Sequence, residues 1–474
     1  MLLCLVLLLS PYLSFSYHTS YTHGGKHFVI RSNDDPKQPE SLPCSAIHAG
    51  RSGSDGLPLM HRSHPCSGVG EAHQTQDEAL AEDVLQRDAL RINSLLGEED
   101  CSPAPAPTSP GTGARIPTKG DPLISLPGAL QYHVTVGFGT PVQRFTVGFE
   151  TATNGATLLQ CKPCATYPEP CSDSFDTSKS SSLTQVPCNS PDCPFQSCPG
   201  RSCTVKVNLN GGRFRGNATF VTDKLTLSPS STVDNFRFAC LEAGLRTTDS
   251  SSGILDLSRN SHSLASRAPS SLFTVAFSYC LPAFKNNVGF LSIGAVRPEF
   301  SGRNVSYTPL RSNAANGNLY FLELVGIGVG GPNLPIPPTT LAGNSLLDLH
   351  TTFTYLKPEV YKVLRDNFRE WMTHYRRAAP RDGLDTCYDF TGLNIVVMPA
   401  ITLNFAGGAS IDLSIPEMMY FPDPNNFFSI ACLAFAATPG NTKIVSVIGA
   451  KAQASMEVVY DLRAGKVGFV PYRC

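Results

Sequence analysis

The sequence predicts a mostly β protein with two lobes, and two observations carry this prediction. From Gln131 onward, short runs of alternating apolar and polar residues are separated by Gly, Pro, Asn and Ser, which is typical of strands joined by tight turns. Two segments 198 residues apart (348 − 150) also match each other. Glu150-Thr-Ala-Thr and Asp348-Leu-His-Thr each place an acid and a threonine after an apolar strand. The duplication suggests that each lobe contributes one acid.

Individual elements can be placed within this pattern. One helix is expected at 358–375, because Pro358 suits a first turn and apolar residues follow at helical spacing along one side. Those apolar residues are Val360, Leu364, Phe368 and Trp371, and we expect all four to pack. Strands are predicted most clearly at Tyr132–Phe138, Arg144–Phe149, Asp223–Leu227 and Glu457–Asp461.

The composition excludes some classes of partner. The chain has 474 residues, 41% of them hydrophobic and 16% charged, so it can bury large cores with fewer charges than the roughly 25% of an average soluble domain. A net charge of −1 offers no basic surface for nucleic acid or anionic lipid. We therefore expect no nucleic-acid partner and no membrane partner. Separately, we expect no cofactor, no metal and a monomer.

The first 122 residues differ from the rest. Residues 1–16 begin with a short apolar run and are predicted to be a secretory signal peptide, although the usual basic residues before that run are missing. A buried N-terminal strand is the alternative. Residues 17–122 are predicted to be a prosegment with one helix at 82–96 and a Pro-rich linker at 101–113. The alternative for the linker is a spacer that is never cleaved.

Sixteen cysteines support a secretory destination, because disulfides persist in oxidising compartments. Cys4 lies in the predicted signal peptide, and Cys44, Cys66 and Cys101 precede the main domain. The remaining twelve are an even number, consistent with six disulfides. They are Cys161, Cys164, Cys171, Cys188, Cys193, Cys198, Cys203, Cys240, Cys280, Cys387, Cys432 and Cys474.

A closely spaced cysteine pair and two Asn-X-Ser/Thr triplets are further local patterns in the sequence. Cys161-Lys-Pro-Cys164 alone could indicate a zinc ligand pair or a redox pair, but the many neighbouring cysteines and the lack of nearby histidines favour structural bridges. Asn217-Ala-Thr and Asn304-Val-Ser match the N-glycosylation signal, and we predict both as glycosylation sites, although such triplets also arise by chance.

Several segments together resemble the pepsin-type aspartic peptidases, in particular the secreted plant group that includes the nepenthesins and the chloroplast-nucleoid-binding-type proteases. Val136-Gly-Phe-Gly-Thr-Pro is similar to the lead-in to the first active-site loop of this family, and Gln160-Cys-Lys-Pro-Cys resembles the start of the cysteine-rich insert of nepenthesins. The resemblance runs from about residue 57 to the end. Further landmarks are Phe277-Ser-Tyr-Cys-Leu-Pro, Asp385-Thr-Cys-Tyr-Asp, Asn404-Phe-Ala-Gly-Gly-Ala, Ala431-Cys-Leu-Ala-Phe and the closing Val467-Gly-Phe-Val-Pro-Tyr-Arg-Cys.

The resemblance implies a pepsin-like double β-barrel with a central cleft and a cysteine-rich insert in the first lobe. The lobes would span 123–300 and 301–474. In this family an acid from each lobe meets in the cleft, and the two carboxylates share a proton and hold the attacking water. The positions that match these acids are Glu150 and Asp348.

Further pairings are implied by the same resemblance. Thr151 and Thr351 would bond across the interface between the lobes and preserve the architecture. Disulfides are implied for Cys387 with Cys432 and for Cys280 with Cys474, although the sequence alone does not fix connectivity.

The first catalytic motif departs from the family pattern of Asp-Thr-Gly-Ser. Glu150 carries one extra methylene, which moves its oxygens by about 1.5 Å, a misplacement that can lower a rate a hundredfold or more. Glu still ionises near pH 4, so acid–base chemistry is not lost in principle. Ala152 replaces the glycine that lets the backbone turn tightly, and its Cβ is expected to interfere with the turn.

The second motif departs from Asp-Ser/Thr-Gly-Thr. Asp348 keeps the acid, but Leu349 lacks the hydroxyl of the family residue. His350 puts a titratable ring where the family has glycine. A protonated His350 could disturb the shared proton. We favour the simpler expectation that this ring points into a rearranged loop or solvent.

Two supporting elements are also altered. Leu209 stands where the family has the tyrosine of the flap, the hairpin that closes over substrate, and it supplies no hydroxyl. Asp256 stands where the first apolar-apolar-Gly support has its glycine, whereas the second copy, Val447-Ile-Gly, is intact. Because such supports fix a site to a fraction of an ångström, these changes predict a relaxed site.

The leading hypothesis is therefore a secreted, disulfide-stabilised relative of the aspartic peptidases with little or no proteolytic activity that binds a protein or peptide ligand in its cleft. The alternative is an active acid endopeptidase that uses Glu150 and Asp348. A third possibility is a storage-like protein without a specific ligand. The expected location is the extracellular space of a plant, the apoplast, and the vacuole is a second possibility.

Overall fold

The computed structural model describes the chain at residues 18–22, 25–31, 44, 56–61, 64–66, 84–86, 88–89, 91–92, 132–152, 156–161, 174–194, 198, 200–209, 214–242, 251–268, 274–283, 287–312, 317–423, 426–439 and 446–471. The predicted signal peptide and linker, and Cys4, Cys101, Cys164, Cys171 and Cys474, lie outside these residues. None of the helices in the described ranges is long and apolar enough to cross a bilayer.

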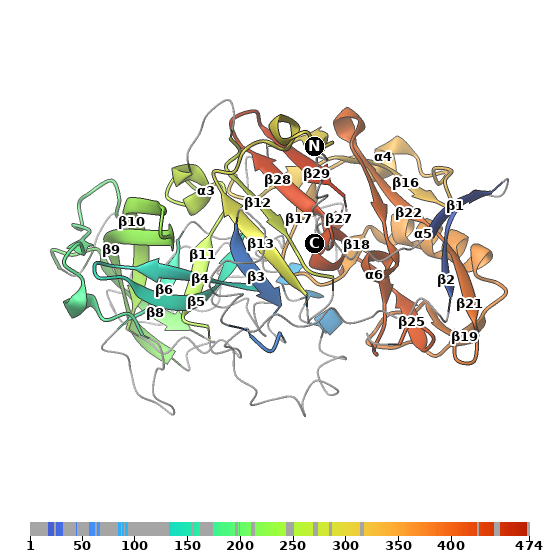
Figure 1. The fold of residues 1–474 in the computed structure, drawn as a ribbon, viewed down its shortest axis with the longest axis horizontal. Coiled ribbons are helices and arrows are strands. Elements are labelled where there is room, and N and C mark those ends of the chain that lie inside the picture. The colour runs from blue at the N-terminus through green and yellow to red at the C-terminus, as the bar shows by residue number, and fades with distance from the viewer. Residues whose placement is uncertain are drawn as a thin grey trace, which may run out of the picture.

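The two halves of the molecule are predominantly strands and lie side by side (Figure 1), as expected for a bilobal, mostly β fold. The largest sheet has 14 strands and runs through the first half into the centre. Its order is β14 (Ser306–Pro309), β29 (Lys466–Val470), β28 (Glu457–Asp461), β12 (Phe277–Cys280), β13 (Val288–Ile293), β3 (Leu57–His61), β4 (Tyr132–Phe138), β5 (Gln143–Glu150), β11 (Gly253–Asp256), β6 (Leu158–Gln160), β10 (Ser231–Leu241), β9 (Phe214–Ser228) and β7 (Thr184–Gln185), with β8 (Thr204–Leu209) also on β9.

The second half is built from smaller sheets with short helices around them. One sheet holds β15 (Phe321–Leu322), β17 (Ser345–Leu347), β27 (Ser446–Ile448), β18 (Thr354–Leu356) and β26 (Phe435–Ala437). Another holds β16 (Leu324–Val329), β22 (Ile401–Phe405) and β23 (Ser410–Leu413), and a third holds β19 (Arg376–Ala378), β20 (Cys387–Asp389), β25 (Ile430–Leu433) and β24 (Met419–Tyr420). Among the described residues from 132 onward, the α-helices are α3 (Leu264–Arg267) in the first half and α4 (Pro338–Leu341), α5 (Pro358–Trp371) and α6 (Ile415–Met418) in the second.

The clearest sequence predictions of secondary structure are confirmed. Strands β4 and β28 have the predicted bounds, β5 extends the predicted run by one residue at each end, and the predicted strand at 223–227 lies within β9. Helix α5 begins at Pro358 as expected but ends at Trp371, before the predicted end at 375. Trp371 packs against Gly330 as expected, although at the end of the helix its side chain is still 37% exposed.

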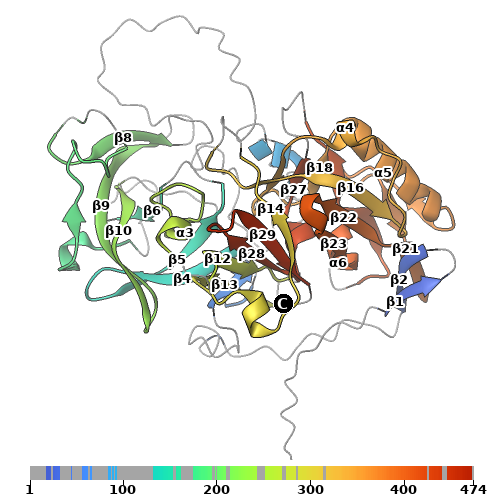
Figure 2. The same ribbon diagram turned by 90° about the horizontal axis from the view of Figure 1, so that it is seen from above.

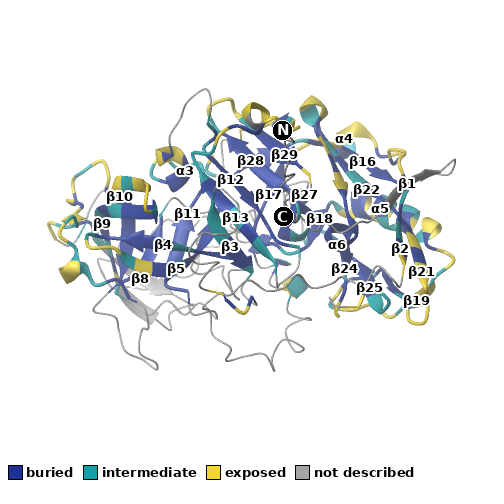
Figure 3. Ribbon diagram, viewed as in Figure 1, coloured by how far each residue is buried: buried dark blue, intermediate teal, exposed yellow. Residues whose placement is uncertain are grey.

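The two halves repeat one arrangement of three strands around each acid. In the first half, β11 pairs in parallel with β5, with Asp256 opposite Glu150, and antiparallel with β6. In the second half, β27 pairs in parallel with β17, whose last residue precedes Asp348, and antiparallel with β18. Residues in these central strands are mostly buried (Figure 3). Each acid therefore lies at the end of a buried strand.

The N-terminal segment is more structured than the prediction of one helix and a linker. Strand β3 lies between β13 and β4, and its Leu59 and Met60 are buried. A hairpin of β1 (His18–Thr22) and β2 (Gly25–Arg31) pairs with the edge of β21 (Ile395–Pro399). Figure 1 shows the hairpin on the outer side of the second half, far from β3. The segment therefore pairs with both halves.

Disulfides fix loops within each half. The described bridges are Cys44–Cys66, Cys161–Cys240, Cys188–Cys198, Cys193–Cys203 and Cys387–Cys432. The last is the pairing that the resemblance implies. Cys280 is also disulfide-bonded, but its predicted partner lies outside the described residues. The structure thus uses Cys161 in a bridge, not in a zinc or redox pair with its neighbour in the sequence.

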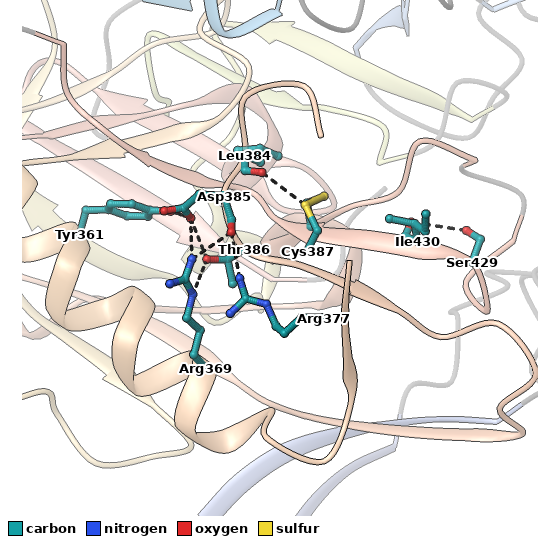
Figure 4. The surroundings of a disulfide bond; sticks show 10 residues. Tyr361, Arg369, Arg377, Leu384, Asp385, Thr386, Cys387, Ser429 and Ile430 are labelled. Carbon is teal, nitrogen blue, oxygen red and sulfur yellow. Dashed lines mark hydrogen bonds and ion pairs between the residues drawn. A yellow bond between two sulfur atoms is a disulfide. The ribbon is translucent and has the colours of Figure 1, made fainter. Parts of the chain in front are cut away.

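Helix α5 is attached to β20 around the Cys387–Cys432 bridge. Figure 4 shows Tyr361 and Arg369 of the helix directed at Asp385, two residues before Cys387. The Tyr361 hydroxyl donates to Asp385 Oδ1 at 2.5 Å, and Arg369 Nη2 donates to the Asp385 carbonyl at 2.9 Å. This network holds the chain from Leu384 to Cys387, which forms part of the surface on which the N-terminal segment packs.

We predict that the hairpin is an integral part of the second half. Phe28 and Ile30 of β2 are 2% and 1% exposed, so Phe28→Ala should lower the free energy of unfolding by about 3 kcal/mol, the cost of truncating a buried aromatic side chain. Hydrogen exchange should also show faster exchange of the β21 amides. The control is Ile395→Ala, because that β21 side chain is 51% exposed and should change stability little. Equal effects of the two substitutions would contradict the prediction.

Candidate functional site

The structure brings the two acids together from the two halves of the molecule. Glu150 ends β5 and Asp348 follows β17, and both side chains are fully buried. A single nitrogen, Nη2 of Arg91, lies 2.9 Å from Glu150 Oε1 and 2.7 Å from Asp348 Oδ1. The sequence-based pairing of positions 150 and 348 therefore corresponds to a real juxtaposition in space.

Glu150 is held through one carboxylate oxygen, and the other faces His350 without a hydrogen bond among the described residues. Its Oε1 accepts the N–H of Ala152 at 3.1 Å as well as the Arg91 bond, and its Oε2 lies 3.2 Å from His350 Nε2. The bond from Ala152 shows that the backbone turn after the acid forms despite the missing glycine. Ala152 does not have a positive φ, so the expectation that its Cβ would interfere was wrong.

Asp348 has a tighter set of partners. Its Oδ2 accepts from the backbone N–H of Thr351 at 2.8 Å, from the Thr351 hydroxyl at 2.6 Å and from Arg91 Nε at 2.7 Å. Behind the acid, Gln453 Nε2 donates to the carbonyls of Asp348 and Ile448 at 3.0 and 2.8 Å. These bonds fix the second loop although Leu349 contributes no hydroxyl.

Arg91 comes from the N-terminal segment, and sequence reasoning did not identify it. Residues 84–86, 88–89 and 91–92 are helical, within the helix predicted at 82–96. They lie beside β18 and β27 in both views, as the light-blue pieces of Figures 1 and 2. The only signal in the sequence was a basic residue on that helix, and basic residues on helices are common on surfaces.

Asp88 provides a second attachment one helical turn earlier. Its carboxylate accepts the backbone N–H groups of Thr352 and Phe353 at 2.9 to 3.1 Å and the hydroxyl of Tyr355 at 3.0 Å. Asp88 and Arg91 are three residues apart and so project from one side of a helix. Both therefore contact the stretch that begins at Asp348.

Apolar contacts complete the attachment. Ile92 is fully buried in a cluster with Ala152, Phe353 and Val447, and Leu85 packs against the same cluster. A Cβ built on Gly383 would lie 2.2 Å from Leu85 Cδ1, so Gly383 leaves the space that Leu85 occupies. The segment thus fills the region between the two acids with both charged and apolar contacts.

Burial and the Arg91 charge give the two acids different pKa values. Burial raises the pKa of Glu150 to about 8, although Arg91 opposes this shift. Burial would also raise the pKa of Asp348, but the nearby Arg91 charge and its hydrogen bonds hold that pKa well below its usual range. The favoured state around neutral pH has an ionised Asp348 paired with Arg91 and a proton on Glu150. This state avoids two like charges in one dry site.

His350 does not point to solvent, so the expectation for this residue was wrong. Its side chain is buried and crosses between the halves, with Nε2 at 3.1 Å from the Phe149 carbonyl and at 3.2 Å from Glu150 Oε2. Burial, with the Arg91 charge as a second cause, lowers the pKa of His350 to about 3. The ring therefore enters the site as a neutral group at most pH values.

The expected threonine contact across the interface is not the one that the structure shows. The Thr351 hydroxyl donates to its own Asp348, and the Thr151 hydroxyl is buried without a hydrogen-bond partner among the described residues. The described contact between the two motifs runs instead from His350 to Phe149 and Glu150. The physical reason is that a histidine ring in place of glycine is long enough to reach the other half.

The remaining predicted positions lie around this site or on the surface. Leu209 ends β8 opposite Phe214 of β9, so the hairpin exists, but its side chain lies outside the described set. Asp256 is buried and accepts the N–H of Ser258 at 2.8 Å. An ordered turn thus replaces the support that glycine gives elsewhere. Asn217 and Asn304 are exposed, and their glycosylation stays a prediction.

Comparisons with known proteins agree with this geometry. Residues 132–295 match the family model described as Xylanase inhibitor N-terminal, and residues 319–471 match Xylanase inhibitor C-terminal. The aspartyl protease AED1 of Arabidopsis thaliana is 31% identical over 449 residues, which cover 92% of this chain and 90% of that protein. The chain belongs to the pepsin-like aspartic peptidases of plants.

Other members of the family extend the comparison. The aspartic proteinase nepenthesin-2 of Nepenthes gracilis is 28% identical over 358 residues, covering 73% of this chain and 78% of that protein. Among solved structures, conglutin gamma from lupine seeds has a TM-score of 0.56 at 18% identity and covers 72% of this chain and 91% of its own. That likeness shows the bilobal, pepsin-like fold.

We predict that the two acids respond differently to neutralisation. Asp348→Asn leaves Arg91 buried beside one carboxyl that favours its neutral form, so it should lower the free energy of unfolding by about 3 kcal/mol or more. Glu150→Gln mimics the protonated acid and should lower the free energy of unfolding much less. Thermal unfolding of both variants near pH 7 is the measurement, and a larger loss for Glu150→Gln would contradict the assignment.

The same assignment predicts a dependence of stability on pH. The pKa of Glu150 is higher in the folded chain than its ordinary value of 4.5, so the folded state binds the proton more tightly. The contribution of Glu150 to stability is therefore fully present below about pH 4.5 and is lost as the pH rises towards 8. The difference in unfolding free energy between wild type and Glu150→Gln should change across this range. A difference that stays constant from pH 4.5 to 8 would show that Glu150 is not the titrating group.

Proposed function

We propose that this chain is a secreted, non-proteolytic or very weakly active member of the aspartic peptidase family that binds a peptide or protein segment between its lobes. One observation carries the proposal: His350 Nε2 lies 3.2 Å from Glu150 Oε2. In the family reaction, the two acids exchange one proton between themselves and the attacking water. Here a buried and mostly neutral imidazole lies against one of the acids, at a position where the family has a glycine.

The geometry of Glu150 supports the same conclusion. One of its oxygens accepts the Ala152 N–H and an Arg91 bond, and the other faces His350. A carboxylate oriented in this way must rearrange before it can hold a water symmetrically with Asp348. Since errors of about 1 Å in such a site can cost a hundredfold in rate, the changes at 150 and 350 predict very slow hydrolysis.

The capacity to bind is supported by what the site already holds. Two buried carboxyls, two backbone N–H groups and an apolar cluster accept a helical segment of the chain itself. We place the protein in the extracellular space, with the vacuole as the second location, because of its apolar N-terminus and its many disulfides. The proposed ligand is a peptide or protein segment, and the proposed state is a monomer.

A second candidate function, acid endopeptidase activity, has one observation in its favour. Both acids lie within hydrogen-bonding distance of one nitrogen, so a water in the place of that nitrogen could contact both. Glu150 and Asp348 would then be the catalytic residues.

The deciding test measures cleavage of a denatured protein at pH 2 to 5. The full-length chain with Arg91→Ala, which loses the basic group between the acids, is assayed with and without pepstatin. Its control adds Asp348→Ala to exclude a contaminating protease. We expect no pepstatin-sensitive cleavage. Cleavage that disappears with pepstatin and in the control would establish the endopeptidase instead.

We further predict that restoring one acid does not restore an enzyme. In the Arg91→Ala background, Glu150→Asp alone should remain inactive, because the His350 ring still lies beside position 150. Adding Ala152→Gly, Leu349→Ser and His350→Gly should produce pepstatin-sensitive cleavage at least about a hundredfold above the single variant. Full activity from Glu150→Asp alone would show that the other three residues do not limit the site.

A further inference from the structure

The contacts of the N-terminal segment define what kind of ligand fits this site. The charged contacts depend on the geometry of the hydrogen-bond donors as well as on charge. Arg91 Nε and Nη2 donate to the two different oxygens of Asp348, each at 2.7 Å, and Nη2 also donates to Glu150 at 2.9 Å. This is a bidentate guanidinium–carboxylate pair with a third hydrogen bond to the other acid.

An arginine suits this arrangement better than a lysine. A lysine ammonium is a single nitrogen and cannot present two parallel N–H groups to one carboxylate. Because both acids are fully buried, loss of the Nη2 bond would leave Asp348 Oδ1 without a donor among the described residues, in a dry site. The site therefore discriminates between two side chains of the same charge.

The contacts of Asp88 add a second requirement. Backbone N–H groups of Thr352 and Phe353 and the Tyr355 hydroxyl converge on one carboxylate. An amide side chain at the same place offers a single acceptor oxygen and directs its NH₂ at one of these donors. A ligand thus needs an acid three residues before the arginine on the same helical face.

An aliphatic residue completes the pattern. Ile92, directly after Arg91, is fully buried among Ala152, Phe353 and Val447, and Leu85 fits against Gly383. Apolar burial of this kind contributes about 1.5 to 3 kcal/mol for a side chain of this size. The charged pair then sets the register, and the apolar contacts add affinity.

We infer that the site between Glu150 and Asp348 binds, as a ligand from another molecule, a helical peptide segment with an acid and an arginine three residues apart and an aliphatic residue after the arginine. This inference rests on the proposed function, binding without efficient hydrolysis. In the intact chain, residues 84–92 are the intramolecular form of that ligand. A segment tethered in this way has an effective concentration of the order of millimolar, so an external segment competes only when the internal one is weakened or displaced.

The test uses a fluorescent peptide with the sequence of residues 82–96 and the full-length chain. In the receptor, Asp88→Ala removes one attachment of its own segment, and Arg91→Glu repels that segment from the two acids. Fluorescence anisotropy near pH 6 should show saturable binding of the wild-type peptide. Replacing Arg91 by Lys or Asp88 by Asn in the peptide should each weaken binding about tenfold or more, and Arg91→Ala should abolish it.

Two further chains keep the result interpretable. If the charge-reversed receptor does not fold, the full-length Arg91→Lys chain serves as receptor, because its own segment is only weakened. A receptor that also carries Asp348→Asn should lose most of its affinity for the wild-type peptide. Equal binding of the Arg and Lys peptides, or no binding to a folded receptor, would overturn the inference.

The outcomes separate this inference from the proposed function. If the receptor binds an unrelated unfolded peptide but not this one, the binding function stands and the ligand class is wrong. Mass spectrometry of the bound peptide gives the other distinction. Pepstatin-sensitive cleavage of the peptide would overturn the non-proteolytic function while it left the recognition of arginine and acid intact.

Discussion

The pairing of Arg91 with Glu150 and Asp348 is the interaction on which the rest of the site depends. Two carboxyls from different halves lie close together in a fully buried region, and such a pair is stable only if a proton or a cation reduces the repulsion between them. Arg91 supplies the cation and burial favours the proton on Glu150. Because the guanidinium bonds to both acids, it also joins the two halves where their central strands end.

A regular backbone on both sides accompanies this constraint. Gln453 holds the carbonyls behind Asp348 and accepts the Tyr279 hydroxyl at 2.5 Å, while Gly449 leaves room for the close approach of the Phe353 carbonyl. In the first half, the Ala152 N–H still bonds to the acid. The loops that carry the two acids are therefore ordered in both halves.

Much of the fold could be predicted from the sequence, because strands and α5 follow from local patterns of apolar residues. The two acids could also be paired, since their motifs repeat. Strands β1 to β3 were missed because their pairing is decided by distant partners, β21, β13 and β4, and not by their own short sequences. His350 was misjudged for a related reason: its place depends on Glu150 and Phe149 in the other half.

The N-terminal segment has one more consequence for how the site is reached. Among the described residues, its contacts with the rest of the chain occur at three places: β2 at the edge of β21, β3 in the middle of the largest sheet, and the helical residues at the acids. The described disulfide within the segment, Cys44–Cys66, does not link it to either lobe. A cut in the predicted linker after the segment would therefore leave it attached through strands and buried side chains, and only its helical part would need to move to expose the two acids. The structure thus separates the part of the segment that stabilises the fold from the part that occupies the site.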